Sequence, residues 1–427
     1  MKIRLHYRQW IQFLLLLAIE FDLPRVGFFS VRKMAFLLLL FYFIRQSEMG
    51  VRISEKLLST AIRISWLFAY TVGLLSIQID DISQIPEGCF GLIHIVGLFL
   101  MLVLYPMLFR GIFRDVTEFT ICQWRVILFQ ALIVLAGCVF DPIRMFVFMN
   151  MAYGDGRLLN NVQIGIRSVG IDLAGAAGSM ILFAGIMCGV YLFYQSKDRK
   201  EKRNIILGWL CIMAALLFVG RTGLCFGGIV ILGVLIHRLC QKDKSVRWLV
   251  LGMAMISCGV VAYAMLNPDS RWVWWIAELS NLFADNKTVD IMLNMNIPGL
   301  TLETFFGTGM VSGPTASGLV LNHDAGYVQT YTGIGVIGAT MYYGLIYCFY
   351  FMLISKVKLS RNKWIYRAFL LVLVIAEVKE PFLRKTPLML ILSTMLILET
   401  DFGKRRNLMD RLQPGAKLLQ KGDTLMT

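Results

Sequence analysis

Repeated apolar runs of close to 20 residues constrain this chain more than any other feature of its sequence. A helix of about 20 apolar residues is long enough to cross the hydrocarbon core of a bilayer. The runs are continuous rather than alternating, which excludes a transmembrane β-barrel. The sequence therefore predicts an all-α, polytopic membrane protein that forms a single integral membrane domain over residues 1–427.

About 12 transmembrane helices are expected. The predicted spans lie near 9–23, 30–44, 60–78, 90–108, 120–140, 173–195, 204–219, 222–237, 246–266, 325–354, 365–378 and 387–399. Composition agrees with this interpretation, because 57% of the residues are hydrophobic and only 16% are charged, unlike a soluble globular protein. The nine cysteines are scattered singly and form no CxxC pair. They are typical of small core residues rather than of a disulfide framework or a zinc site.

The net charge of +15 is explained by topology. With the N-terminus inside, 27 of the 42 Lys and Arg residues fall on inside connectors and 12 on outside connectors. This asymmetry follows the positive-inside rule and predicts that both termini are cytoplasmic. It also removes the reason to expect nucleic acid as a partner.

Two outside loops are long and are predicted to carry the chemistry, residues 141–172 and 267–324. The second loop ends in HDAGYVQTYTGIGVIG, where His323 and Asp324 precede a glycine-rich helix. By the predicted topology His323 is the outward-facing histidine, and a histidine beside a carboxylate is suited to general-base catalysis. The alternative is that Asp324 caps the helix and His323 is a surface residue of the loop.

Arginines at the outer membrane face are the candidate anion ligands. Arg167 is followed by ten residues and then Gly178, and Arg221 begins a tight Arg-Thr-Gly turn between two spans. A guanidinium group at this depth suits a pyrophosphate, although each arginine also fits an interfacial residue that contacts lipid phosphate. The segment KEPFLRK at 379–385 adds three cations and Glu380, either at the rim of a site or beside the membrane.

On these residues the chain resembles the O-antigen and capsule repeat-unit polymerases, the Wzy family, which are related to the O-antigen ligases. Four features are similar to that family: the layout of spans, the Arg-x10-Gly spacing at Arg167 and Gly178, the Arg-Thr-Gly turn at Arg221, and FGTGMVSG followed by HDAGY. A second Arg-x10-Gly is absent, because Leu282 occupies the position at that distance from Arg271.

The resemblance implies a glycosyltransferase that acts at the periplasmic face of the bacterial inner membrane. Undecaprenyl-pyrophosphate-linked glycans would be both donor and acceptor, membrane lipid would surround the protein, and a chain-length regulator and a flippase would be its partners. Positively charged Arg167, Arg221 and Arg271, with Tyr327 and Gly178, are the expected substrate-binding residues, and His323 or Asp324 the base. Neither a cofactor nor a metal ion is expected. An O-antigen ligase and a lipid-linked oligosaccharide flippase are the alternatives.

Overall fold

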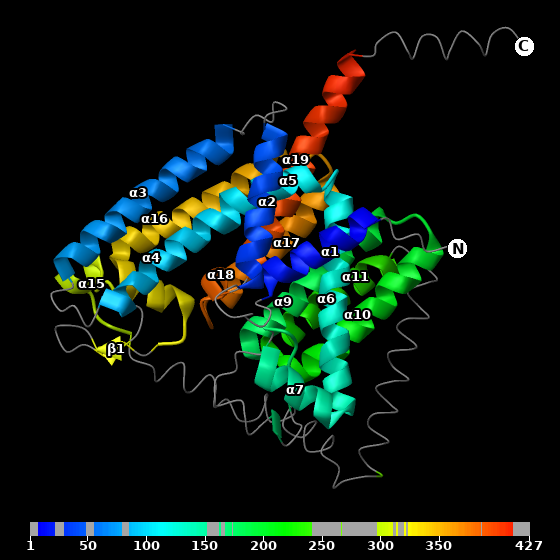
Figure 1. The fold of residues 1–427 in the computed structure, drawn as a ribbon, viewed down its shortest axis with the longest axis horizontal. Coiled ribbons are helices and arrows are strands. Elements are labelled where there is room, and N and C mark those ends of the chain that lie inside the picture. The colour runs from blue at the N-terminus through cyan, green and yellow to red at the C-terminus, as the bar shows by residue number, and fades with distance from the viewer. Residues whose placement is uncertain are drawn as a thin grey trace, which may run out of the picture.

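The chain is almost entirely helical in the computed structural model (Figure 1). The structure describes residues 7–21, 30–47, 55–78, 85–151, 162–163, 167–172, 174–240, 266, 297–310, 313–314, 320–321, 323–385 and 387–412. The helices are α1 Tyr7–Glu20, α2 Val31–Ser47, α3 Glu55–Gln78, α4 Ile85–Phe99, α5 Tyr105–Ile112, α6 Val116–Val139, α7 Asp141–Met151, α9 Gly175–Gln195, α10 Arg199–Val219, α11 Arg221–Cys240, α15 Leu302–Phe306, α16 Gly326–Lys356, α17 Ser360–Ala376, α18 Phe382–Lys385 and α19 Leu388–Leu412. A π-helical turn, Leu100–Leu104, joins α4 to α5.

The prediction of an all-α fold is confirmed, and several long apolar helices support the predicted membrane-spanning character. Within the described residues, seven helices are long and apolar enough to cross a membrane: Leu57–Ile77, Gly91–Ile112, Val116–Val139, Gly175–Gln195, Arg199–Val219, Arg221–Arg238 and Gly326–Lys356. Each of the other predicted spans overlaps a helix except 246–266, which lies outside the described residues apart from its last position. A total of twelve spans stays a prediction.

Helix α9 is the centre of the main bundle. It packs against α6, α10, α11, α17 and α19, and 89% of its apolar window is buried. A helix that is apolar all round belongs in such a position, because it has no polar face to turn to solvent. Helices α3, α4 and α16 form a second group, in which α3 contacts both of the others, and this group extends away from the main bundle (Figure 1).

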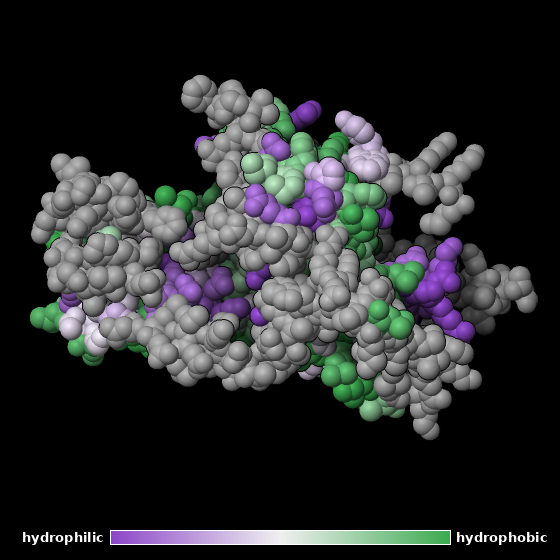
Figure 2. Space-filling view, turned by 90° about the horizontal axis from the view of Figure 1, so that it is seen from below, coloured by the Kyte–Doolittle hydropathy of each residue, from purple (hydrophilic) through white to green (hydrophobic). Residues whose placement is uncertain are grey.

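Short connectors make neighbouring helices alternate in direction, so that one end of the bundle collects several helix termini. At this end, which we call the loop end, α9, α11, α16 and α19 begin and α10 and α17 end. The predicted loop 141–172 contains α7 at this end, and loop 267–324 contains α15 and a two-residue antiparallel ladder of β1 (Gly313–Pro314) and β2 (Val320–Leu321) that pairs Gly313 with Leu321. Figure 2 shows the molecule from the side on which α7 lies, where hydrophilic side chains form separate patches among hydrophobic ones.

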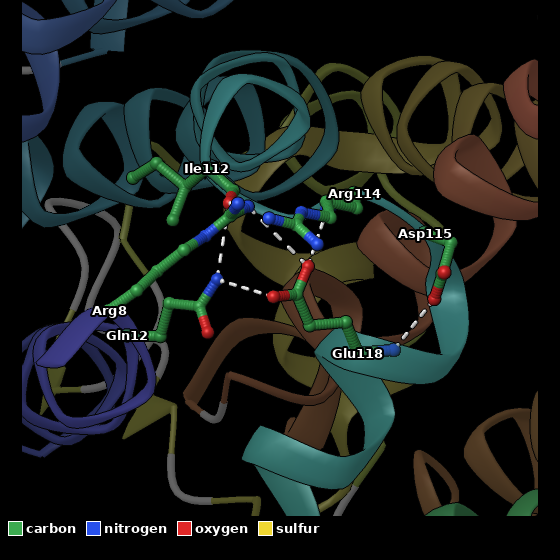
Figure 3. Close-up of polar contacts among 6 residues, drawn as sticks. All are labelled: Arg8, Gln12, Ile112, Arg114, Asp115 and Glu118. Carbon is green, nitrogen blue, oxygen red and sulfur yellow. Dashed lines mark hydrogen bonds and ion pairs between the residues drawn. The ribbon is translucent and has the colours of Figure 1, made fainter. Parts of the chain in front are cut away.

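A polar network fixes the first helix to the turn between α5 and α6 (Figure 3). Arg8 and Gln12 on α1 donate to the carbonyl of Ile112 at 2.7 and 3.2 Å. Gln12 also donates to the Glu118 carboxylate at 3.1 Å, and the backbone N–H of Arg114 donates to the same carboxylate at 2.7 Å. The side chains of α1 thereby supply hydrogen-bond donors to a carbonyl at the end of α5 that has no partner within its own helix.

Helix α16 is kinked at Gly335, which has φ 73° and non-helical backbone angles. Short helix α15 crosses at this point, and a Cβ at Gly335 would lie 2.2 Å from the backbone of Phe306. The carbonyls of Thr332 and Gly333 accept hydrogen bonds of 2.9 Å from the backbone N–H groups that follow α15. Glycine permits both the close approach and the left-handed conformation, and the incoming loop satisfies carbonyls near the break in the helix.

Candidate functional site

The two predicted arginines, Arg167 and Arg221, lie at the loop end of the bundle. Arg167 is half-buried and precedes Ser168, whose backbone N–H donates to Phe218 at 3.4 Å and whose hydroxyl donates to Val134 at 2.8 Å. These bonds hold the segment against the ends of α10 and α6. Arg221 is the first residue of α11, directly after α10 ends. The fold therefore brings together two segments that are 54 positions apart in the sequence.

A third cation, Lys379, joins them from the turn after α17. Its ammonium group donates a 2.7 Å hydrogen bond to the hydroxyl of Thr222, the second residue of α11. Burial lowers the pKa of Lys379, and the nearby positive charges of Arg167 and Arg221 lower it further, while Glu380 acts in the opposite direction. We call Arg167, Arg221 and Lys379 the cation cluster. Three segments distant in the sequence contribute to it, and its combined field favours an anion.

The turn that carries Lys379 is held by a buried carboxylate. Glu377 is 1% exposed, and its side chain accepts hydrogen bonds from the Tyr343 hydroxyl at 3.1 Å and from the backbone N–H of Leu383 at 2.9 Å. Its carbonyl accepts from the backbone N–H of Gly326 at 2.9 Å. A Cβ at Gly326 would lie 2.3 Å from the Glu377 carboxylate, so only glycine allows α16 to begin against this turn.

Arg384 connects the same stretch to the predicted catalytic pair. Its guanidinium group donates to the Gln329 side chain on α16, which in turn donates to the His323 carbonyl at 2.6 Å. The Nε atom of Arg384 is buried without a partner among the described residues. Residues 377–385, which we call the bridging segment, therefore contact α11 through Lys379 and α16 through Arg384.

His323 and Asp324 lie immediately before α16, and their geometry separates their roles. The His323 Nδ1 accepts a 3.0 Å hydrogen bond from the backbone N–H of Ala325. A neutral ring with an accepting Nδ1 carries its proton on Nε2, and this Nε2 is buried with no partner among the described residues. His323 is consequently placed to donate a hydrogen bond. Asp324 is exposed, and α16 has Ala325 as its N-cap with no side-chain capping bond, so Asp324 does not cap the helix.

The other predicted binding residues lie elsewhere or outside the described residues. The Tyr327 hydroxyl is used between helices, sharing a 2.7 Å hydrogen bond with Tyr347 and donating to the Val374 carbonyl at 3.0 Å. Gly178 is buried in the first turn of α9 and lines a separate cavity. Arg271 is outside the described residues. Within those residues no three His, Cys, Asp or Glu side chains gather as a metal site would require.

Comparisons with known proteins give no relative from which a role could be transferred. No protein-family model, no curated protein and no solved structure matches this chain. The candidate site therefore stands on its own geometry. That geometry comprises a cation cluster, an exposed carboxylate with a histidine donor beside it, and a bridging segment. The bridging segment contributes Lys379 to the cluster and is linked to the His323 carbonyl through Arg384 and Gln329.

The charges of the bridging segment were evident in the sequence, but the residues that position this segment were not predicted. Glu377 appears in the sequence only as an acidic residue at the end of an apolar run, and Gln329 as a polar residue in a glycine-rich helix. The available signal was Glu377 itself, which follows Ile375-Ala376 and precedes Val378-Lys379 at the end of an apolar segment. A carboxylate in a membrane segment costs free energy unless hydrogen bonds compensate it, so its presence indicates that such bonds exist.

Proposed function

We propose that this chain is a glycosyltransferase that polymerises polyprenyl-pyrophosphate-linked oligosaccharide repeat units at the periplasmic face of the bacterial inner membrane. The observation that carries the proposal is the cation cluster, in which Arg167, Arg221 and Lys379 meet at the end of the bundle that also presents His323 and Asp324. A pyrophosphate leaving group needs positive charge where its negative charge develops. The predicted topology puts this end outside, where lipid-linked repeat units would be displayed.

The chemistry is a single displacement at the anomeric carbon of the donor sugar. The acceptor hydroxyl attacks this carbon, a new C–O bond forms, and the bond to the pyrophosphate oxygen breaks with its electron pair leaving on the pyrophosphate. Asp324, exposed and not used as a helix cap, receives the hydroxyl proton. The proposal requires the bound glycan to reach the buried Nε2–H of His323, which then donates to one of the glycan oxygens. The displacement inverts the anomeric centre.

Each cation has a distinct part in this reaction. Arg167 and Arg221 provide planar guanidinium groups that can hold two phosphate oxygens at once. Lys379 adds a further positive charge, and its hydrogen bond to Thr222 fixes the position of the ammonium group. Because α11 begins at Arg221, the N–H groups of its first turn add partial positive charge to the same region.

A strain that lacks this chain is expected to lose all surface polymer longer than one repeat unit. The surface glycan, resolved by gel electrophoresis, distinguishes the proposal from its alternatives. Single repeat units on the lipid A core support the polymerase, because export and ligation still occur. Long polymer that is not attached to the lipid A core would instead indicate a ligase, and failure to export any unit would indicate a flippase. Restoration of the full pattern by the wild-type chain is the control.

A further inference from the structure

A cavity lies between the end of α1, the start of α2, the α4–α5 helix and the first turns of α9 and α19. Its volume is about 360 Å³. Three charged side chains line it, Glu20, Arg32 and Asp172, together with Tyr105, and the remaining wall is apolar or made of small residues. The function proposed above uses none of these three side chains.

Glu20 is the buried polar group of this cavity. It is 4% exposed, and one carboxylate oxygen, Oε2, accepts a 2.6 Å hydrogen bond from the Gln123 side chain. The other oxygen, Oε1, is buried and has no hydrogen-bond partner among the described residues. Leaving a buried carboxylate oxygen unpaired is costly, so this atom calls for a donor that the described part of the chain does not supply.

Arg32 and Asp172 form the polar side of the cavity. Arg32 donates to the Asp172 carboxylate at 3.2 Å and to the Glu20 carbonyl at 3.3 Å. Both side chains are about one third exposed, at 38% and 31%. They are therefore the accessible part of the cavity, whereas Glu20 is its buried part.

The backbone at Asp172 has a conformation that is uncommon for a residue other than glycine. Asp172 has φ 48° and, within the described residues, is the one non-glycine position with a positive φ. The side-chain amide of Gln130 fixes the preceding residue, accepting from the Ile171 N–H at 3.0 Å and donating to the Ile171 carbonyl at 3.1 Å. Such strain persists only where the surroundings determine the conformation, and it is concentrated at functional sites.

The opposite wall is irregular as well. Leu100 and Met101, which line the cavity, lie in the π-helical turn Leu100–Leu104. Pro106 follows this turn and has no backbone N–H to continue a regular α-helical pattern. Single π-helical turns are frequent at functional sites. Two independent departures from regular backbone thus border the same cavity.

We propose that this cavity binds a protonated primary amine, with Glu20 and Asp172 as its carboxylate acceptors. The cavity contains two carboxylates and one guanidinium group. Arg32 is paired with Asp172 through Nη2, and its Nε is buried without a hydrogen-bond partner among the described residues. A ligand that brings one positive charge and several N–H donors compensates the remaining carboxylate and gives Glu20 Oε1 a partner. The amine can belong to an aminophospholipid headgroup or to an amino sugar of a glycan.

Thermal unfolding of the full-length protein in a neutral detergent tests this proposal without any activity measurement. The lipid comparison uses phosphatidylethanolamine against phosphatidylcholine, whose quaternary amine has no N–H donor. The soluble comparison uses glucosamine against N-acetylglucosamine, which has no charged amine. A ligand concentration of about ten times the dissociation constant should raise the unfolding temperature by about 2 °C.

Glu20→Gln and Glu399→Gln are the paired variants. Glu20→Gln should abolish the amine-dependent shift and leave the ligand-free unfolding temperature unchanged or higher, because it removes a buried charge. Glu399 accepts from Tyr191 and Asn362 outside the cavity, at 2.9 and 3.0 Å, so Glu399→Gln should keep the shift. A shift with phosphatidylethanolamine alone identifies the lipid, and one with glucosamine alone identifies the sugar. No amine-specific shift in the wild type, or an equal shift in Glu20→Gln, would overturn the proposal.

Discussion

Arg167→Ala is expected to reduce polymerisation by roughly 30-fold to several thousand-fold, enough to replace long chains by short ones. The reason is its place in the cation cluster, where the positive charges of Arg167 and Arg221 lie close enough to the partly buried Lys379 ammonium group to lower its pKa. Loss of one member of a desolvated charge pair typically costs about 2–5 kcal/mol. Arg167→Lys should also be clearly impaired, because it keeps the charge but cannot hold two oxygens with one planar group. Chain-length profiles at matched expression level measure both effects.

The combination of variants distinguishes a shared site from independent effects. If Arg167 and Arg221 bind the same leaving group, the double alanine variant should be much less impaired than the product of the two single effects predicts. Lys33→Ala is the matched control, since Lys33 is an exposed cation near the start of α2, and it should give a wild-type profile. If Arg167→Lys gives a wild-type chain-length profile and Arg167→Ala shortens the chains only a little, Arg167 is an ordinary interfacial residue.

Asp324→Asn is expected to lower the rate by about 10²–10⁴-fold, the range typical for loss of a general base. Asparagine keeps the shape of the side chain but cannot take the acceptor proton. The variant should retain its expression level and its unfolding temperature, because Asp324 is exposed and makes no capping bond with α16. Single-turnover transfer from a purified lipid-linked donor gives the rate of the chemical step directly.

His323→Gln separates the two candidates for the base. Glutamine can place an N–H near the position of the histidine Nε2, so a residue that acts as a donor should be partly replaced. The Nδ1 contact to Ala325 makes His323 such a donor, and we expect a smaller loss than for Asp324→Asn. The reverse order, with His323→Gln the more damaging change, would assign the base to His323 and contradict the tautomer inferred from the structure.

The helical character of the fold was predictable because a membrane leaves the backbone little choice. Without water in the hydrocarbon core, each spanning segment must satisfy its own hydrogen bonds, so continuous apolar runs become helices. The runs at 173–195 and 204–219 accordingly become α9 and α10, with ends that differ by a few residues. Within the predicted loops, α7 follows α6 almost without a break, and loop length alone gave no indication of it.

The candidate site was predictable only in part, because sequence spacing does not show which loops meet. Arg167 and Arg221 could be proposed as anion ligands from their charge and predicted depth. Their meeting with Lys379 depends on how α17 packs beside α9, through contacts that no local pattern records. The same limit applies to His323, because its tautomer depends on one backbone N–H, and to Glu20, whose partner Gln123 is 103 positions away.

The kink at Gly335 also determines how far from the lipid the transfer would take place. Helix α16 has 31 residues, and at about 1.5 Å per residue the stretch after Gly335 rises roughly 30 Å, close to the thickness of the hydrocarbon core. The turns before the kink, about 14 Å of helix, are left over once that thickness is filled. If the proposed function is correct, His323 and Asp324 at their start would stand among head groups and sugars, so the polyprenyl chain would stay in the bilayer and only the glycan would reach the base.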